Sequence, residues 1–309
     1  MGINRKLADR VALVAGATRS AGRAIAVELA RAGAFVYATG RSSRLTGPSE
    51  MTRPEVIEDT EILMRQAGGE GRAIRVDHLE PGQVGDLIRV IDKEQGRLDI
   101  LVNDMFGGDR YAQWEKPLWA HDLSGGLRML RMGIDTHLIT LAHALPLILR
   151  GEKGIVIEMT DGTEEYNANF RQNVGFYYDL VKSTVGRILK GLAFELSMYP
   201  VTALGVTPGW LRSEAMLEKF GVTEHTWRDA CRIDPGFAIS ESPTYVARGI
   251  AAMAADPQVS RFGGRVLSSR QLADLYNITD VDGTRPDCWG LIAAYGEDFG
   301  NVGSVEDFR

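Results

Sequence analysis

Short apolar runs alternate with longer amphipathic patterns along most of the 309-residue chain. The short runs are typical of strands buried in a parallel sheet, and the longer patterns space their apolar residues as a helix does. Predicted strands cover 11–15, 34–39, 72–76, 98–102, 154–160, 201–207 and 264–267; predicted helices cover 21–32, 55–66, 84–94, 127–149, 174–198 and 244–254. This alternation predicts an α/β fold with a doubly wound, seven-stranded parallel sheet and helices on both faces.

The predicted domain organisation is a single dinucleotide-binding and catalytic unit over 5–280, followed by a tail over 281–309. The sequence after Ser268 is interpreted as polar and glycine-rich. Insertions at 107–121 and 213–241 follow the carboxyl ends of predicted strands. Ligands of open α/β sheets bind there, so we expect both insertions to contact substrate. A third insertion covers 42–53.

Composition excludes several functional classes. The net charge is −6 and the basic residues are scattered, which argues against nucleic acid as a partner. No apolar run is long enough to span a membrane, no amino-terminal signal core is visible, and two cysteines fit a reduced compartment. The five histidines show no metal-ligand spacing. We therefore expect a cytoplasmic protein without a metal.

The first predicted strand runs directly into A-G-A-T-R-S-A-G-R-A-I-A, residues 15–26. A small-residue turn that opens a helix directs backbone N–H groups at a pyrophosphate, as in the Rossmann-type fold. Gly16 provides the turn and Gly22 the close approach of helix and strand. Ser20 stands where the pattern has a middle glycine, which requires a negative φ at that serine. The candidate cofactor residues of this loop are Gly16, Thr18, Arg19, Ser20, Ala21 and Gly22.

The second predicted strand ends in T-G-R, with Gly40 and Arg41 where an NAD-binding fold has an acidic residue for the ribose 2′-hydroxyl. A carboxylate would repel a 2′-phosphate, whereas the guanidinium groups of Arg19 and Arg41 can bind one. The sequence therefore predicts NADP(H) as the cofactor.

The segment F-Y-Y-D-L-V-K, residues 176–182, offers two tyrosines before one lysine. Residues four apart share a helix face to within about 40°, and residues five apart do not. Tyr178, not Tyr177, therefore shares a face with Lys182. A nearby cation favours the phenolate and lowers the pKa of a tyrosine, so Tyr178 is the candidate acid/base and Lys182 its electrostatic support.

These motifs together resemble the short-chain dehydrogenase/reductase family over residues 10 to 270, in a branch with an extended carboxyl terminus. The glycine loop, Asn103 in V-N-D-M, the Y-x-x-x-K helix and T-P-G-W-L-R-S at 207–213 occur in the family's order. The resemblance implies that Asp77 contacts the adenine, Asn103 lines the adenosine ribose and Ser213 contacts the carboxamide or pyrophosphate. It also implies that Lys182 holds the nicotinamide ribose.

Two positions depart from the family pattern. Thr160 and Asp161 stand where the family ends its fifth strand, and Asp161 falls on the catalytic serine. Thr160 or Thr163 could supply the hydroxyl, Asp161 could donate when protonated, or the site could have lost carbonyl reduction. An ionised Asp161 would raise the pKa of Tyr178.

The family's asparagine in the long helix corresponds to Met132. The nearby His137 could replace the proton relay of that asparagine, although a histidine on a buried helix is more often a core residue.

The expected function is NADP(H)-dependent interconversion of a carbonyl and an alcohol, in a homodimer or homotetramer. Tryptophan and phenylalanine residues in the loops expected over the nicotinamide suggest a bulky apolar substrate: Trp114, Trp119, Trp210, Phe220 and Trp227. Loop packing or a subunit interface would explain the same residues. The rivals are an NADP-binding regulator that has lost turnover and a lyase or isomerase that uses Asp161 as a base.

Overall fold

A parallel sheet forms the centre of the protein, for which a computed structural model describes residues 5–114, 116–297 and 305–309. Within these residues, seven strands are hydrogen-bonded in the order β3-β2-β1-β4-β5-β6-β7, and every pair is parallel. The strands are β1 (Val11–Ala15), β2 (Phe35–Gly40), β3 (Glu70–Arg75), β4 (Ile100–Asn103), β5 (Gly154–Met159), β6 (Val201–Thr207) and β7 (Val266–Ser268). The predicted doubly wound sheet is confirmed.

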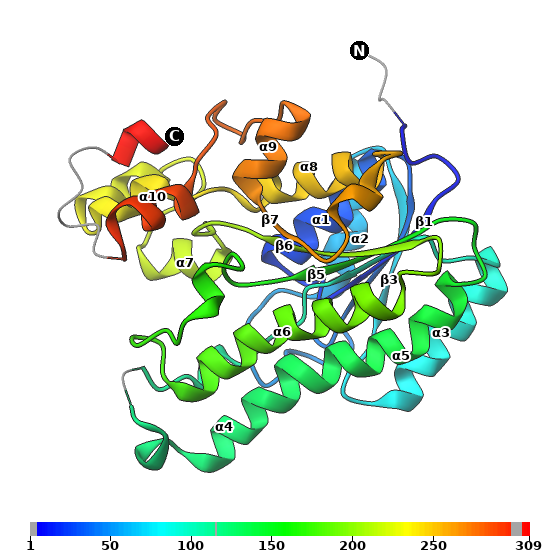
Figure 1. Cartoon of the computed structure of the whole chain (residues 1–309), viewed down its shortest axis with the longest axis horizontal. Coiled ribbons are helices and arrows are strands. Elements are labelled where there is room, and N and C mark those ends of the chain that lie inside the picture. The colour runs from blue at the N-terminus through cyan, green and yellow to red at the C-terminus, as the bar shows by residue number, and fades with distance from the viewer. Residues whose placement is uncertain (1–4, 115, 298–304) are drawn as a thin grey trace.

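Helices cover both faces of this sheet (Figure 1). One face packs against α1 (Ser20–Arg31), α2 (Ile57–Gln66), α8 (Pro243–Ala254) and α9 (Ser269–Tyr276). The other packs against α3 (Pro81–Gln95), α5 (Thr136–Ile148) and α6 (Phe176–Glu195). Three shorter helices, α4 (Leu123–Leu130), α7 (Glu214–Lys219) and α10 (Cys288–Tyr295), lie toward the left of Figure 1.

Strand β1 marks the point where the strand order reverses. It pairs with β2 on one side, Val11 opposite Phe35, and with β4 on the other, Ala12 opposite Ile100. All five residues of β1 are buried because helices cover both faces. A crevice opens beyond the carboxyl ends of the strands at such a reversal, and ligands of this fold class bind there.

Several sequence expectations differ from the structure. The predicted helix over 127–149 is divided into α4, a π-helical turn over Arg131–Asp135, and α5. Strand β3 begins at Glu70, two residues before the predicted start. The description of the tail as polar is wrong for 288–295, which forms α10 and buries Cys288 and Leu291 against Ile239. Residues 298–304 of the predicted tail lie outside the described residues.

Candidate active site

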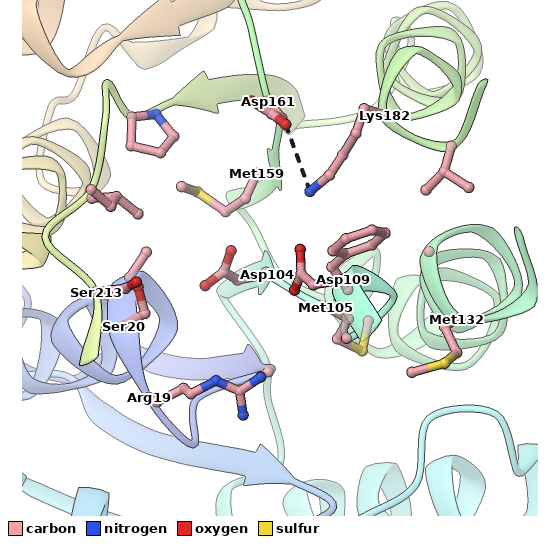
Figure 2. Close-up of a pocket in the computed structure, with 18 of the residues that line it drawn as sticks. Arg19, Ser20, Asp104, Met105, Asp109, Met132, Met159, Asp161, Lys182 and Ser213 are labelled. Atoms are coloured by element: carbon pink, nitrogen blue, oxygen red, sulfur yellow. Dashed lines mark ion pairs between the residues drawn. The ribbon is translucent and has the colours of Figure 1, made fainter. Parts of the chain in front are cut away.

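A cavity of about 1050 Å³ lies at the carboxyl ends of the strands. The glycine loop after β1 and the ends of β2, β4, β5 and β6 line it, together with part of α6 and α10. Figure 2 shows Arg19 and Ser20 toward one end of this cavity and Asp161 and Lys182 toward the other. We call the first part the nucleotide end and the second the chemistry end.

The glycine loop has the close backbone packing that is typical of a dinucleotide-binding loop. Two of its glycines have no room for a side chain. Gly16 has a φ of +94°, and a Cβ there would lie 2.3 Å from the carbonyl oxygen of Asp104. A Cβ on Gly22 would lie 2.3 Å from the carbonyl oxygen of Gly16. The start of α1 is thereby held close to the cavity, where the backbone N–H groups of Ser20 and Gly22 donate to the carboxylates of Glu214 and Asp104. Burial raises the pKa of Asp104 to about 7, which weakens the repulsion between this carboxyl group and a phosphate.

The expectation of a negative φ at Ser20 is wrong. Ser20 has a φ of +50°, in the left-handed region that favours glycine. Its backbone N–H donates to the carboxylate of Glu214 on α7, at 3.0 Å from Oε2. The loop therefore keeps the conformation of the glycine pattern although the residue is serine, and the backbone strain is tolerated locally.

Most predicted cofactor residues line the cavity: Gly16, Thr18, Arg19, Ser20, Ala21, Arg41, Asp77, Lys182 and Ser213. Gly22 is buried behind the loop. Asn103 is also fully buried and does not line the cavity, because its side chain turns into the sheet and donates to Glu158 Oε1 at 2.7 Å. The implied contact of Asn103 with the adenosine ribose is therefore not supported by its position.

Three side chains converge at the chemistry end. The hydroxyl of Tyr178 donates to Asp161 Oδ2 at 3.2 Å, and Lys182 Nζ lies 4.0 Å from the same oxygen (Figure 2 marks the ion pair). Tyr178 and Lys182 come from the first turns of α6, whose apolar side is buried through Val181, Val185 and other residues. Tyr177 is buried elsewhere, against Gly126 and His121. The structure thus brings Tyr178, Lys182 and Asp161 together, as helix geometry and the strand alignment predict.

The electrostatics of Tyr178 differ from the sequence expectation. Burial, followed by the charge of Asp161, raises the pKa of Tyr178 well above its usual value. Lys182 was expected to lower that pKa, but its ammonium group is closer to the ring of Phe106, at 3.7 Å from the centroid, than to the ring of Tyr178, at 5.3 Å. Tyr178 consequently holds its proton at neutral pH in this state.

Arg171 belongs to the same cluster, and sequence reasoning missed it. This buried guanidinium contacts the cavity carboxylate Asp161, with NH1 3.5 Å from Oδ2, and Asp179 on α6, with Nε 3.3 Å from Oδ1. It therefore offsets the negative charge that Asp161 brings beside Tyr178. The only sequence signal is the long separation of 17 residues between Asp161 and Tyr178, which leaves room for this loop.

The hydroxyl groups near Asp161 are used elsewhere. Thr160 Oγ1 donates to the carbonyl oxygen of Gly162 at 3.1 Å, and Thr163 Oγ1 accepts from the backbone N–H of Tyr166 at 3.2 Å. Of the three candidates for the serine position, Asp161 alone has a hydrogen bond to Tyr178 within the described residues.

Comparison with known proteins agrees with this geometry. A family model described as short chain dehydrogenase matches residues 10–222. The chain belongs to the short-chain dehydrogenase/reductase family. Dehydrogenase/reductase SDR family member 1 of Mus musculus is 30% identical over 280 residues, which cover 89% of this chain and 84% of the relative.

One further relative by sequence and one solved structure are also similar to this chain. A 7alpha-hydroxysteroid dehydrogenase of Clostridium sardiniense is 26% identical over 215 residues, covering 69% of this chain and 75% of the relative. The crystal structure of a short chain dehydrogenase from Shigella flexneri, complexed with NADP, superimposes with a TM-score of 0.67 at 17% identity, covering 86% of this chain and 99% of that one. The protein is thus an oxidoreductase of a short-chain dehydrogenase/reductase family that uses nicotinamide cofactors and acts on small molecules.

The second departure from the family's motifs, at Met132, lies in the π-helical turn. The carbonyl oxygen of Met132 accepts a hydrogen bond from Thr136 Oγ1 at 2.7 Å. His137 does not reach Tyr178 or Lys182, because Nδ1 lies 2.6 Å from Glu158 Oε2 and Nε2 lies 2.9 Å from the carbonyl oxygen of Met105. The geometry therefore favours a structural role for His137 over a proton relay.

The buried pair of His137 and Glu158 holds strand β5 to α5. Both side chains are almost fully buried. Burial alone would lower the pKa of His137, but the charge of Glu158 and the hydrogen bonds to Glu158 and Met105 together outweigh burial and raise the pKa. Asn103 supplies a further hydrogen bond to Glu158. Sequence reasoning missed Glu158, whose alternating position on an otherwise apolar strand was the available signal.

The aromatic residues predicted to cover the chemistry end are only partly there. Trp114 lies 5.1 Å from the ring of Tyr178, and Trp210 lines the cavity. Trp119 is exposed, and Phe220 and Trp227 pack in a separate cluster around Phe237. Instead α10 contributes Trp289, whose ring lies 4.9 Å from Tyr166.

The described residues contain neither a metal-binding cluster nor a membrane-spanning helix. Across 5–114, 116–297 and 305–309, no group of three or more His, Cys, Asp or Glu side chains has an arrangement that could hold a metal ion. In the same residues, no helix is both long and apolar enough to cross a membrane.

Proposed function

We propose that the protein is an NADP(H)-dependent oxidoreductase that interconverts a carbonyl and an alcohol, with Tyr178 as the acid/base. The convergence of Tyr178 and Lys182 on one oxygen of Asp161 carries this proposal, because it lies in the same cavity as the glycine loop. When bound, the cofactor would supply or accept a hydride at the substrate carbon.

The protonation state of Tyr178 favours reduction as the working direction. A tyrosine whose pKa is raised keeps its proton and can donate it to the oxygen of a carbonyl that is being reduced. Lys182 and Arg171 then stabilise the phenolate that remains. Asp161 accepts a hydrogen bond from the Tyr178 hydroxyl in the resting site, so the substrate oxygen has to replace Asp161 as the hydrogen-bond acceptor.

The choice of NADP(H) rests on Arg19 and Arg41, which both line the nucleotide end. No carboxylate stands at the end of β2, where Gly40 approaches the side chain of Thr18 so closely that a Cβ would lie 1.9 Å from its Oγ1. The Shigella flexneri relative of the same fold is complexed with NADP, which agrees with this choice.

The chemistry end suits a bulky apolar carbonyl compound. Trp114, Tyr166, Trp210 and Trp289 line the cavity around Tyr178 and present flat apolar surfaces. One relative is a 7alpha-hydroxysteroid dehydrogenase, so alicyclic ketones are suitable members of a substrate panel.

The test is the transfer of deuterium from NADPH deuterated at the nicotinamide C4 to a panel of ketones and aldehydes. We expect an alcohol that carries deuterium on the former carbonyl carbon, detected by mass spectrometry, with NADPH consumed in equal amount. Tight NADPH binding without any consumption over the panel would instead support the regulator.

A second candidate function uses Asp161 directly. Its side chain is 36% exposed in the cavity and lies beside the cationic groups of Arg171 and Lys182. An ionised carboxylate can take a proton from carbon, as a lyase or isomerase requires. Turnover without consumption of NADPH, abolished in Asp161→Asn, would establish this function in place of carbonyl reduction.

Three further expectations belong to this proposal. They are one functional unit over 5–280 with a tail over 281–309, a homodimer or homotetramer, and a cytoplasmic location.

A further inference from the structure

The insertion after β2, residues 42–53, forms an ordered loop beside the nucleotide end. Ser43 and Gly47 form an antiparallel bridge, and the backbone N–H of Ser49 donates to Ser42 Oγ at 2.9 Å. These bonds fix the end of the loop and place the side chain of Glu50 next to Arg41.

Glu50 is bound by three side chains from three parts of the chain. Its Oε1 accepts from Arg41 NH1 at 2.6 Å and from Arg128 NH2 at 2.7 Å. Its Oε2 accepts from the hydroxyl of Tyr111 at 2.6 Å and from Arg128 Nε at 3.2 Å. Burial alone would raise the pKa of Glu50, but the hydrogen bonds from Arg128, Tyr111 and Arg41 outweigh it and lower the pKa to about 2. Glu50 is therefore ionised at any working pH.

Arg41 is held at one nitrogen only. Its NH1 is bound by Glu50, while in the described part of the chain no hydrogen bond engages its Nε or NH2. Arg41 lines the cavity, whereas Glu50 does not. A Cβ on Gly107 would lie 3.2 Å from Arg41 NH2, so the glycine lets the guanidinium lie close to the loop after β4.

We propose that Glu50 is a positioning residue for cofactor choice, which orients Arg41 so that its unbound donors face the 2′-phosphate of NADP(H). This inference rests on the proposed use of NADP(H) and adds the residue that makes Arg41 effective. A long arginine side chain loses much rotamer freedom on binding, and a partner that fixes it beforehand removes that cost. Because Arg41 and Arg128 together outnumber Glu50, the cluster keeps a net positive charge toward a phosphate.

Charge alone predicts the opposite result, which makes the proposal testable. Removing a carboxylate near a phosphate site should tighten phosphate binding if only the Coulomb interaction mattered. If Glu50 acts by positioning Arg41, its removal should weaken binding. The direction of the change in phosphate affinity therefore distinguishes a positioning role from a purely Coulombic effect.

The experiment is calorimetric titration with adenosine 2′,5′-bisphosphate and with 5′-AMP, which differ only in the 2′-phosphate. In Glu50→Ala we expect affinity for the bisphosphate to fall about tenfold, the scale of one charge-assisted hydrogen bond, with 5′-AMP affected less than about twofold. Glu50→Gln, which keeps the size and one acceptor oxygen, should show a smaller fall. General damage to the fold would reduce both affinities alike.

Asp59→Ala is the matched control, because its carboxylate pairs with Arg44 in an exposed position near the same insertion. We expect it to leave both affinities unchanged. Unchanged or tighter binding of the bisphosphate in Glu50→Ala overturns the positioning role, provided that Arg41→Ala weakens it. If Arg41→Ala has no effect either, the NADP(H) proposal itself fails, and the inference fails with it.

Discussion

The two ends of the cavity are built in different ways. The nucleotide end depends mainly on backbone packing, because Gly16 and Gly22 allow a close approach, and the side chains of Arg19 and Arg41 line it as well. The chemistry end is made of charged and aromatic side chains, of which Asp161, Arg171 and Tyr178 come from separate segments. The nucleotide end keeps the family's pattern with one substitution, whereas the chemistry end replaces the serine and adds an arginine. Backbone geometry tolerates few changes, while a set of side chains can be rebuilt around new charges.

The largest expected effect isolates the chemistry end. Tyr178→Phe should lower the rate of NADPH-dependent reduction by roughly 10²- to 10⁴-fold, because the proton donor is lost. NADPH affinity, measured by fluorescence titration, should change less than about twofold since the nucleotide end is untouched. Tyr177→Phe is the control and should keep its rate, because the Tyr177 ring packs against Gly126 away from Asp161. Equal losses in both variants would contradict the choice of Tyr178.

The second prediction concerns Glu158, the buried carboxylate of β5, which contrasts with the cavity carboxylate Asp161. Glu158 is sealed in the core with His137, whereas Asp161 faces the cavity. His137→Gln should lower the free energy of unfolding by about 3 kcal/mol, because it leaves the buried Glu158 without its charged partner.

The pH dependence of this loss has a defined sign. The pKa of His137 is raised in the folded state, so the pair's contribution is fully present below the unfolded-state pKa of about 6.5 and is lost as pH rises through the folded-state pKa. Urea unfolding over a pH series should show the largest difference from the parent at acid pH. His143→Gln, on the same helix, is the control. An equal loss of unfolding free energy in that variant would show that the His137–Glu158 pair is not the cause of the loss.

The third prediction concerns the charge that Asp161 brings to the site. Asp161→Asn removes a charge that raises the pKa of Tyr178, so that pKa should fall. Reduction needs protonated Tyr178, and the alkaline limb of kcat/KM should therefore move to lower pH. At pH 7 the rate should change less than about tenfold, because the proton donor remains. Asp109→Asn should shift the limb in the same direction by less. A limb that stays in place in Asp161→Asn would mean that Asp161 does not control Tyr178.

The smallest expected effect comes from Ser20, which stands where the family's glycine pattern has its middle glycine. Ser20→Gly should raise the free energy of unfolding by roughly 1 kcal/mol, because the φ of +50° costs a serine about that much and costs glycine little. Thermal unfolding would measure it. Ser20→Ala keeps the strain and should give no gain, so a stabilised Ala variant would show that the strain is not the cause.

The roles of residues that lie close together in the sequence, on one helix or one turn, could be predicted well from the sequence. The four-residue spacing of Tyr178 and Lys182 on α6 decides which tyrosine faces the lysine, and the small-residue turn at Gly16 follows directly from β1. The alternation of apolar runs was sufficient to predict the doubly wound parallel sheet, because parallel strands with helical crossovers allow few topologies.

Residues that act through distant partners could not be predicted. The sequence determined the fold class, the family and the tyrosine–lysine pair, since each depends on local periodicity or spacing. Only the tertiary structure decided that Asp161 accepts a hydrogen bond from Tyr178 and that Arg171 offsets the charge of Asp161. It also decided that Asn103 turns inward to Glu158 and that α10 supplies part of the chemistry end. Charge and burial act through space between segments far apart in the chain, and a single sequence does not show which segments meet.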